Sequence, residues 1–131
     1  MQNKIQKWKP ALLTGNTTLT NANDSGNIVI NLDSATYFKC SQFMLYAFVN
    51  GSPGTIAYCL MTSLIIGGQE AKKIIVGSGL HSSVFSRSAS VPLLWLPMNV
   101  DIESNSQIQI NLTTETAGAK IFALFSGMQK I

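Results

Sequence analysis

Residues 107–112 read Gln-Ile-Gln-Ile-Asn-Leu, and residues 27–32 read Asn-Ile-Val-Ile-Asn-Leu. In both stretches an isoleucine or leucine recurs at every second position. This two-residue period is that of a β-strand with one buried side and one solvent-facing side. The residues that we expect to point into a core are Ile28, Ile30, Leu32, Ile108, Ile110 and Leu112.

Two longer segments, residues 37–49 and 55–66, are apolar on both sides and are joined by Asn50-Gly51-Ser52-Pro53-Gly54. Turn-forming residues between two strand-like runs predict a hairpin, here with a five-residue loop. Strands without a polar side are typical of positions that are buried on both faces. We therefore expect two central strands, each covered by another sheet layer or by a neighbouring subunit.

Further strand-like segments, separated by turns rich in glycine or proline, occur at residues 70–76, 80–87, 91–96 and 119–126. No window shows the apolar period of a helix. About eight strands with short spacings favour an antiparallel sandwich or barrel, and the eight-stranded jelly roll fits this count best. The fold class is thus predicted as all-β, a single antiparallel β-sandwich of residues 21–131. Residues 1–20 would precede it as an extended N-terminal arm or as an edge strand.

The chain has 131 residues, of which only 11% are charged, against roughly 25% in typical domains. Neutral polar cover comes instead from 10 Asn, 14 Ser, 10 Thr and 7 Gln. The net charge of +3 is too small for the dense basic surface that nucleic acids select. Low charge also reduces repulsion between copies, and amides and hydroxyls bond readily across wet interfaces. The composition favours a protein that assembles and disfavours nucleic acid as its partner.

The longest unbroken apolar run, residues 43–49, has seven residues, whereas a helix that crosses a bilayer needs about twenty. Residues 1–10 contain Lys4, Lys7 and Lys9, but no apolar segment follows them as it would in a secretory signal. We expect no signal peptide, no transmembrane segment and no membrane partner.

His81 is the only histidine, and Ser82, Ser83 and Ser86 lie near it in the sequence. A Ser-His-acid site needs such a histidine as its base, but the Gly-x-Ser-x-Gly elbow that often carries the serine does not occur. We interpret His81 as a polar residue at a loop or strand end. The chain is predicted to be no enzyme and to have no catalytic residues.

Metal and cofactor patterns were sought with the same result. Cys40 and Cys59 lack the spacing of metal ligands, which favours two buried free thiols, with a disulfide as the open alternative. Asp101 and Glu103 are interpreted as a solvated strand or turn edge in preference to a sugar-cleaving pair. Phosphate-binding glycine motifs are missing. We expect no metal, no cofactor and no small-molecule substrate.

Trp8 and Trp95 offer the largest apolar side chains, and tryptophan is enriched at the centres of interfaces. Trp95 lies between two leucines in a proline-bounded segment, which favours core packing over an interface. Trp8 lies between Lys7 and Lys9, well ahead of the first strong strand. Docking of this segment on a neighbouring protein and its return as an edge strand are both open alternatives, and contact with nucleic acid is the third and less favoured one. The candidate interface residues are Lys7, Trp8, Lys9 and Trp95.

The layout of the chain resembles that of small β-sandwich structural proteins of tailed bacteriophages. The resemblance comprises Ile5-Gln6-Lys7-Trp8-Lys9-Pro10, residues 91–97, residues 105–110 and a closing strand at 121–127. It covers nearly the full chain and carries over no functional residues. It implies a minor capsid, decoration, head-fibre or tail component, made in the host cytoplasm and located in the virion.

Two functional hypotheses of different classes follow. The first is a non-enzymatic virion structural protein that forms a homo-oligomer, or packs on a capsid or tail lattice, through contacts with itself and other virion proteins. The alternative is a lectin-like module that recognises cell-surface glycan through exposed aromatic residues and loops. Its candidate platform consists of Tyr37, Tyr46, Tyr58 and Trp95.

Overall fold

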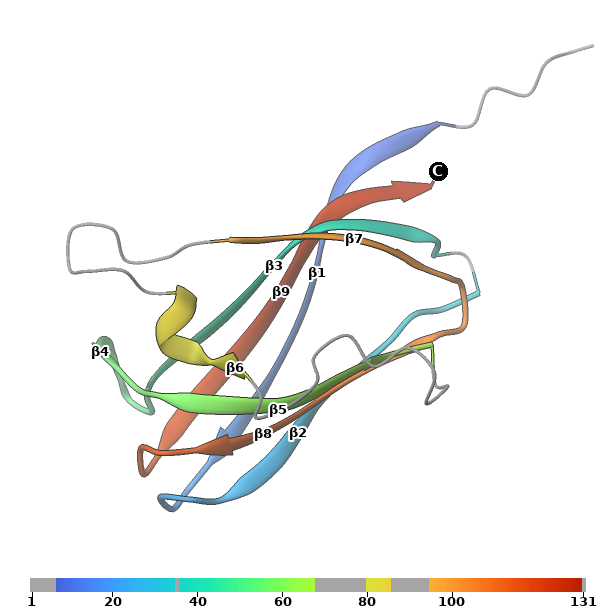
Figure 1. Ribbon diagram of the computed structural model, residues 1–131. Coiled ribbons are helices and arrows are strands. Elements are labelled where there is room, and N and C mark those ends of the chain that lie inside the picture. The colour runs from blue at the N-terminus through green and yellow to red at the C-terminus, as the bar shows by residue number, and fades with distance from the viewer. Residues whose placement is uncertain (1–6, 35, 68–79, 86–94, 131) are drawn as a thin grey trace, which may run out of the picture.

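The computed structural model describes residues 7–34, 36–67, 80–85 and 95–130. Its elements are β1 (Trp8–Leu19), β2 (Ser25–Asn31), β3 (Phe38–Val49), β4 (Ser52–Ile56), β5 (Cys59–Ile66), β6 (Leu80–His81), the 3-10 helix η2 (Ser82–Phe85), β7 (Leu96–Ile102), β8 (Gln107–Thr114) and β9 (Ala119–Lys130). The strand pairs are antiparallel, and two sheets pack against each other (Figure 1). The predicted antiparallel β-sandwich is confirmed.

The first sheet has the order β1-β9-β3, and the far edge of β3 pairs with β7 and then with β4. The second sheet has the order β2-β8-β5-β6. Across both sheets β1 pairs with β9, β2 with β8, β3 with β7 and β5 with β6. Each of these pairs joins a strand of the range β1 to β5 with a strand of the range β6 to β9.

The core lies between the inner faces of the two sheets. All six residues predicted from the two-residue period to face it, in residues 28–32 and 108–112, are buried. The ring centroids of Phe43 and Phe125 in the first sheet are 4.9 Å apart, and Phe43 meets Phe85 of η2 edge-on at 5.5 Å. Burial of each such side chain contributes roughly 1.5–3 kcal/mol.

The long hairpin predicted from residues 37–49 and 55–66 is wrong. β3 pairs with β4 only at its end, and the chain then crosses to the second sheet, where β5 pairs with β8. The crossing satisfies backbone groups on both sides: the Ala57 N–H donates to the Ala47 carbonyl at 3.1 Å, and the Tyr58 N–H donates to the Thr116 hydroxyl at 3.1 Å. Because β3 and β5 belong to opposite sheets, each supplies apolar side chains to the shared core. Both are central strands, as predicted.

The strand predicted over residues 80–87 is limited to Leu80–His81, after which the chain turns into η2. The Ser82 hydroxyl accepts a hydrogen bond from the Cys59 N–H at 3.0 Å, and the Ser83 N–H donates to His81 Nδ1 at 3.2 Å. Such local side-chain bonds compete with strand pairing. The strand predicted at residues 70–76 lies outside the described residues.

The short strand predicted at residues 91–96 is placed differently where the structure describes it, since β7 begins at Leu96 and continues to Ile102. Residues 91–94 lie outside the described residues. Pro97 therefore lies inside β7, opposite Gln42 and beside a bulge in β3. Proline is accommodated there because β7 is an edge strand and needs no further backbone donor.

The segment around Trp8 is an edge strand. β1 pairs with β9 over its full twelve residues, from Trp8 opposite Lys130 to Leu19 opposite Ala119. The extended arm is therefore not confirmed for residues 8–19, and residues 1–6 lie outside the described residues. Close packing against β2 fixes the strand, since a Cβ at Gly15 would come within 2.7 Å of Ile28.

Cys40 and Cys59 are buried free thiols on β3 of the first sheet and β5 of the second. Burial raises the pKa of each thiol from its ordinary 9.0 to about 11. Hydrogen bonding with the Gln42 backbone lowers the pKa of Cys40, and hydrogen bonding with the Ser82 side chain lowers that of Cys59, but both offset burial only in part. The thiols are held neutral in the core.

Gly127 allows β9 to approach β3 closely. An added Cβ would lie 2.8 Å from the Lys39 carbonyl carbon and 3.0 Å from Cys40 Cα, and backbone atoms cannot move aside as a side chain can. We expect Gly127→Ala to lower the free energy of unfolding in urea by about 3 kcal/mol. Gly54→Ala is the control, because nothing lies within 4 Å of a Cβ there. Equal losses in both variants would contradict this account of the β3–β9 contact.

The raised thiol pKa values predict a pH dependence of stability. A thiol whose pKa is raised by folding stabilises the native state fully below its ordinary pKa of 9.0, and this contribution is lost as pH rises through about 11. We expect the urea midpoint of the native chain to fall more steeply between these pH values than that of a Cys40→Ala, Cys59→Ala variant. Identical slopes would show that the thiols do not contribute.

Candidate interaction face of the first sheet

The outer faces of the two sheets differ in chemistry. That of the second sheet is mainly neutral and polar, with Val29, Leu60 and Ile65 as its apolar members. On the second sheet, β2, β8 and β5 contain no acidic or basic residue. Neutral side chains on this face bond one another: the Gln107 amide donates to Asn31 at 3.0 Å, and the Asn111 amide donates to the Ser63 hydroxyl at 2.8 Å. The polar groups of this face are therefore largely satisfied within the chain.

The outer face of the first sheet is apolar where β3 and β9 pair. Register pairs Met44 with Leu124 and Tyr46 with Phe122, and Phe48 follows on β3. We define these five residues as the aromatic patch. The rings of Phe48 and Phe122 stack with centroids 5.7 Å apart, and Tyr46 lies 5.6 Å from Phe48. Except for buried Met44, the patch residues are half-buried, although they face away from the core.

Both apolar and polar residues border the aromatic patch. Exposed Leu12 and Ile56 extend the apolar surface on the neighbouring strands β1 and β4. Neutral Asn16 and Thr14 of β1 lie opposite Phe122 and Leu124. The Lys120 ammonium lies 5.5 Å from the Phe122 ring centroid. An apolar centre with a polar rim is the usual anatomy of a protein–protein contact.

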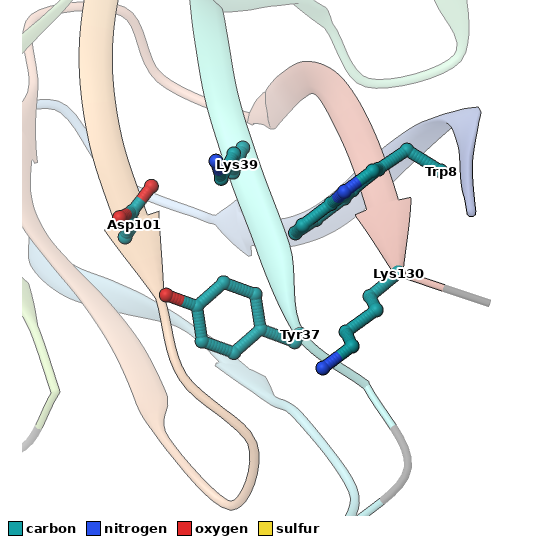
Figure 2. Close-up of a pocket in the computed structure, with 5 residues that line it drawn as sticks. All are labelled: Trp8, Tyr37, Lys39, Asp101 and Lys130. Carbon is teal, nitrogen blue, oxygen red and sulfur yellow. The ribbon is translucent and has the colours of Figure 1, made fainter. Parts of the chain in front are cut away.

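Trp8 lies at one end of the same outer face. Its ring meets Tyr37 edge-on at 5.9 Å, and the Lys39 ammonium lies 4.9 Å from its centroid. Asp101 of β7 is opposite Lys39, and Lys130 of β9 is opposite Trp8. These five side chains line a depression of about 290 Å³ (Figure 2). We refer to them as the Trp8 cluster.

The Trp8 cluster holds one carboxylate, that of Asp101. Partial burial raises the pKa of Tyr37 above its ordinary value, and the nearby carboxylates of Asp101 and Glu103, with a hydrogen bond to Asp101, raise it further. The hydroxyl therefore stays protonated at neutral pH. Two ammonium groups, Lys39 and Lys130, complete the lining. This arrangement is suited to recognition, since it offers aromatic rings and hydrogen-bonding groups.

The structure separates the four predicted interface residues. Lys7 and Lys9 are exposed beside Trp8 at the start of β1. Trp95 packs partly buried against the core, and the next residue, Leu96, pairs with Phe43 well along β3 from the Trp8 cluster. Of the four residues, Trp8 lines the depression, whereas Trp95 lies elsewhere, directly before β7 of the first sheet, so their role as interface residues stays a prediction.

His81 is held by two side chains. Nδ1 lies 2.8 Å from the Ser83 hydroxyl, and Nε2 lies 2.9 Å from a Glu115 carboxylate oxygen. Tyr58 stacks on the ring at 5.8 Å. The Ser83 N–H donates to Nδ1, which leaves Nε2 as the ring atom that faces the Glu115 carboxylate. These surface hydrogen bonds link η2 to the loop after β8. Sequence reasoning named Ser83 but missed Glu115, which lies 34 residues from His81 in the sequence.

Comparison of the chain with protein-family models, with curated proteins and with solved structures found no match. Within the part of the chain that the structure describes, no helix is long and apolar enough to cross a membrane. The same residues contain no group of three or more His, Cys, Asp or Glu side chains placed to hold a metal ion. The interaction face is therefore interpreted from its own geometry.

Proposed function

We propose that this chain is a non-enzymatic structural protein of a virus particle, which assembles with copies of itself or with other virion proteins through the outer face of its first sheet. The aromatic patch is the observation that carries the proposal. It presents Tyr46, Phe48 and Phe122 on a face that no described strand covers. Aromatic side chains are enriched at the centres of such contacts.

The contrast between the two outer faces supports this proposal. A sandwich that stayed alone in solution would gain from neutral or charged polar cover on both faces. The second sheet has mostly such cover, with Val29, Leu60 and Ile65 among its polar residues. The outer face of the first sheet instead has the stacked rings of Phe48 and Phe122. Burying apolar surface is favourable by roughly 25 cal/mol for each Å² removed from water. Low overall charge adds little repulsion between neighbouring copies.

The virion setting is proposed from the resemblance to bacteriophage structural proteins together with the strand pairing. The pairs β1–β9, β2–β8, β3–β7 and β5–β6 are those of a ribbon rolled into two facing sheets, which supports the jelly-roll form of the sandwich. Jelly rolls are frequent in viral capsid proteins. Detection of the chain in purified particles by mass spectrometry is the expected result.

Glycan binding is a second candidate function, which the Trp8 cluster favours. Its depression combines two aromatic rings with a carboxylate and two ammonium groups, which are groups able to stack on a sugar ring and to bond its hydroxyls. The platform predicted from Tyr37, Tyr46, Tyr58 and Trp95 is not assembled, because Tyr46 belongs to the aromatic patch and Tyr58 stacks on His81. A glycan-array signal lost in Trp8→Ala and kept in Trp95→Ala would favour this function.

Replacing aromatic residues of the patch with glutamine, a residue type found on the outer face of the second sheet, tests whether the patch drives assembly. We expect a Tyr46→Gln, Phe122→Gln variant to fold but to lose the concentration-dependent association of the full chain, measured by sedimentation velocity. Association is lost because the two substitutions remove the apolar centre of the patch, and because the glutamine side chains form hydrogen bonds to water. Val29→Gln is the matched control, since Val29 is the exposed apolar residue on the second sheet.

Two results would contradict the proposed function. One is a native chain that sediments as a monomer at all concentrations, together with particles that assemble without it at unchanged stability and infectivity. The other is association that the Tyr46→Gln, Phe122→Gln variant retains in full while the circular-dichroism spectrum shows a native fold.

A further inference from the structure

We propose that two copies of this chain pair antiparallel along the free edge of β1, joining their first sheets into one continuous sheet. The inference rests on the proposed function, because it names how one copy meets another. β1 ends the first sheet, and no described strand pairs with its outer edge. The occupant that we assign to this edge is β1 of a second copy.

Hydrogen bonding in the neighbouring strands shows which groups of β1 are free. The Lys130 N–H donates to the Tyr37 carbonyl at 2.9 Å, so even-numbered residues of β9 direct their backbone groups to the β3 side. Even-numbered residues of β1 lie opposite them, as Pro10 lies opposite Met128, and consequently point away from β9. This position also explains why a proline, which lacks an N–H, is accommodated at Pro10.

Beyond Pro10 the free edge offers a row of backbone donors and acceptors. By this alternation it is formed by the N–H and C=O groups of Leu12, Thr14, Asn16 and Thr18, which point away from β9. Exposed edges are normally protected by charge, by proline or by shortness. From residue 10 to residue 19 the strand carries no charge and has its one proline at the start.

The other edges of the sandwich are protected or shorter. β6 has two residues, and β4 has five that include Pro53. β7 contains Pro97 and the charged Asp101. β2 is uncharged but has seven residues, against twelve in β1. The edge with the longest unprotected row is therefore that of β1.

A second copy fits this edge better than an unrelated strand does. Antiparallel pairing about a two-fold axis sets the same edge of each copy against the other, so one row of backbone groups serves both partners. The residues that would face each other along this edge include Leu12, Thr14, Asn16 and Thr18, which are all uncharged, so no register brings like charges together there. In one continuous sheet the two outer faces point the same way, so both aromatic patches would lie on one side of the pair.

Proline substitution at the free edge tests the pairing in the full-length protein. Thr14→Pro removes an edge N–H with the same orientation as Pro10 and leaves the bonds between β1 and β9 intact. We expect the dimer dissociation constant from sedimentation equilibrium to rise by at least about tenfold, which corresponds to the loss of one to two hydrogen bonds. Thr14→Ala is the control, since it removes the same side chain and keeps the N–H.

Hydrogen exchange gives a readout that does not depend on a variant. Amides of Leu12, Thr14, Asn16 and Thr18 should exchange more slowly as the concentration of the native chain rises. Fast exchange at every concentration, or a Thr14→Pro variant that dimerises as the native chain does, would overturn edge pairing. Suppose that Thr14→Pro leaves the dimer intact and that the Tyr46→Gln, Phe122→Gln variant dissociates it. The proposed function then stands, and only the pairing along β1 is overturned. A native chain that is monomeric throughout would overturn both.

Discussion

The pairing of β3 with β9 is the constraint on which the rest of the structure depends. The two strands run side by side over almost their full length, and at Gly127 their backbones come closer than any side chain would allow. Alternate residues of this pair, such as Phe43 and Phe125, fill the core. The residues between them cannot also turn inward, so Tyr46 and Phe122 are held on the outer face. The chemistry of that face is therefore a consequence of strand geometry, which links the fold to the proposed assembly.

Much of the fold could be predicted from the alternation of residues. The buried sides of β2 and β8 follow from one period, because a strand with one wet face leaves no other arrangement. The path of residues 37–66 could not be predicted, since a turn at Asn50–Gly54 is compatible both with one hairpin and with a crossing between sheets. Only the partners available to β5 decide between them. The strand predicted over residues 80–87 ends at His81. There the Ser82 hydroxyl accepts from the Cys59 N–H, and the Ser83 N–H donates to His81 Nδ1 in place of strand pairing.

The candidate site was predictable in part. The segment Lys7-Trp8-Lys9 indicated an interaction surface, but Tyr37, Lys39, Asp101 and Lys130 reach Trp8 only through the sheet register, which one sequence does not contain. The aromatic patch had a visible signal. Phe122 and Leu124 alternate with core residues on a strand whose second face is also apolar, and the same holds for β3. An apolar strand with two such faces needs either a second layer or a partner.

Hydroxyl-radical footprinting of the native chain is the most direct test of the central claim, which is that the outer face of the first sheet is covered in the assembled state. Oxidation of Tyr46, Phe48 and Phe122 would be compared between dilute protein and assembled protein or particles. Tyr58 is the internal reference, since it is 41% exposed and lies away from this face. The account predicts protection of the three patch residues with Tyr58 unchanged. Equal oxidation of the patch in both states would contradict it.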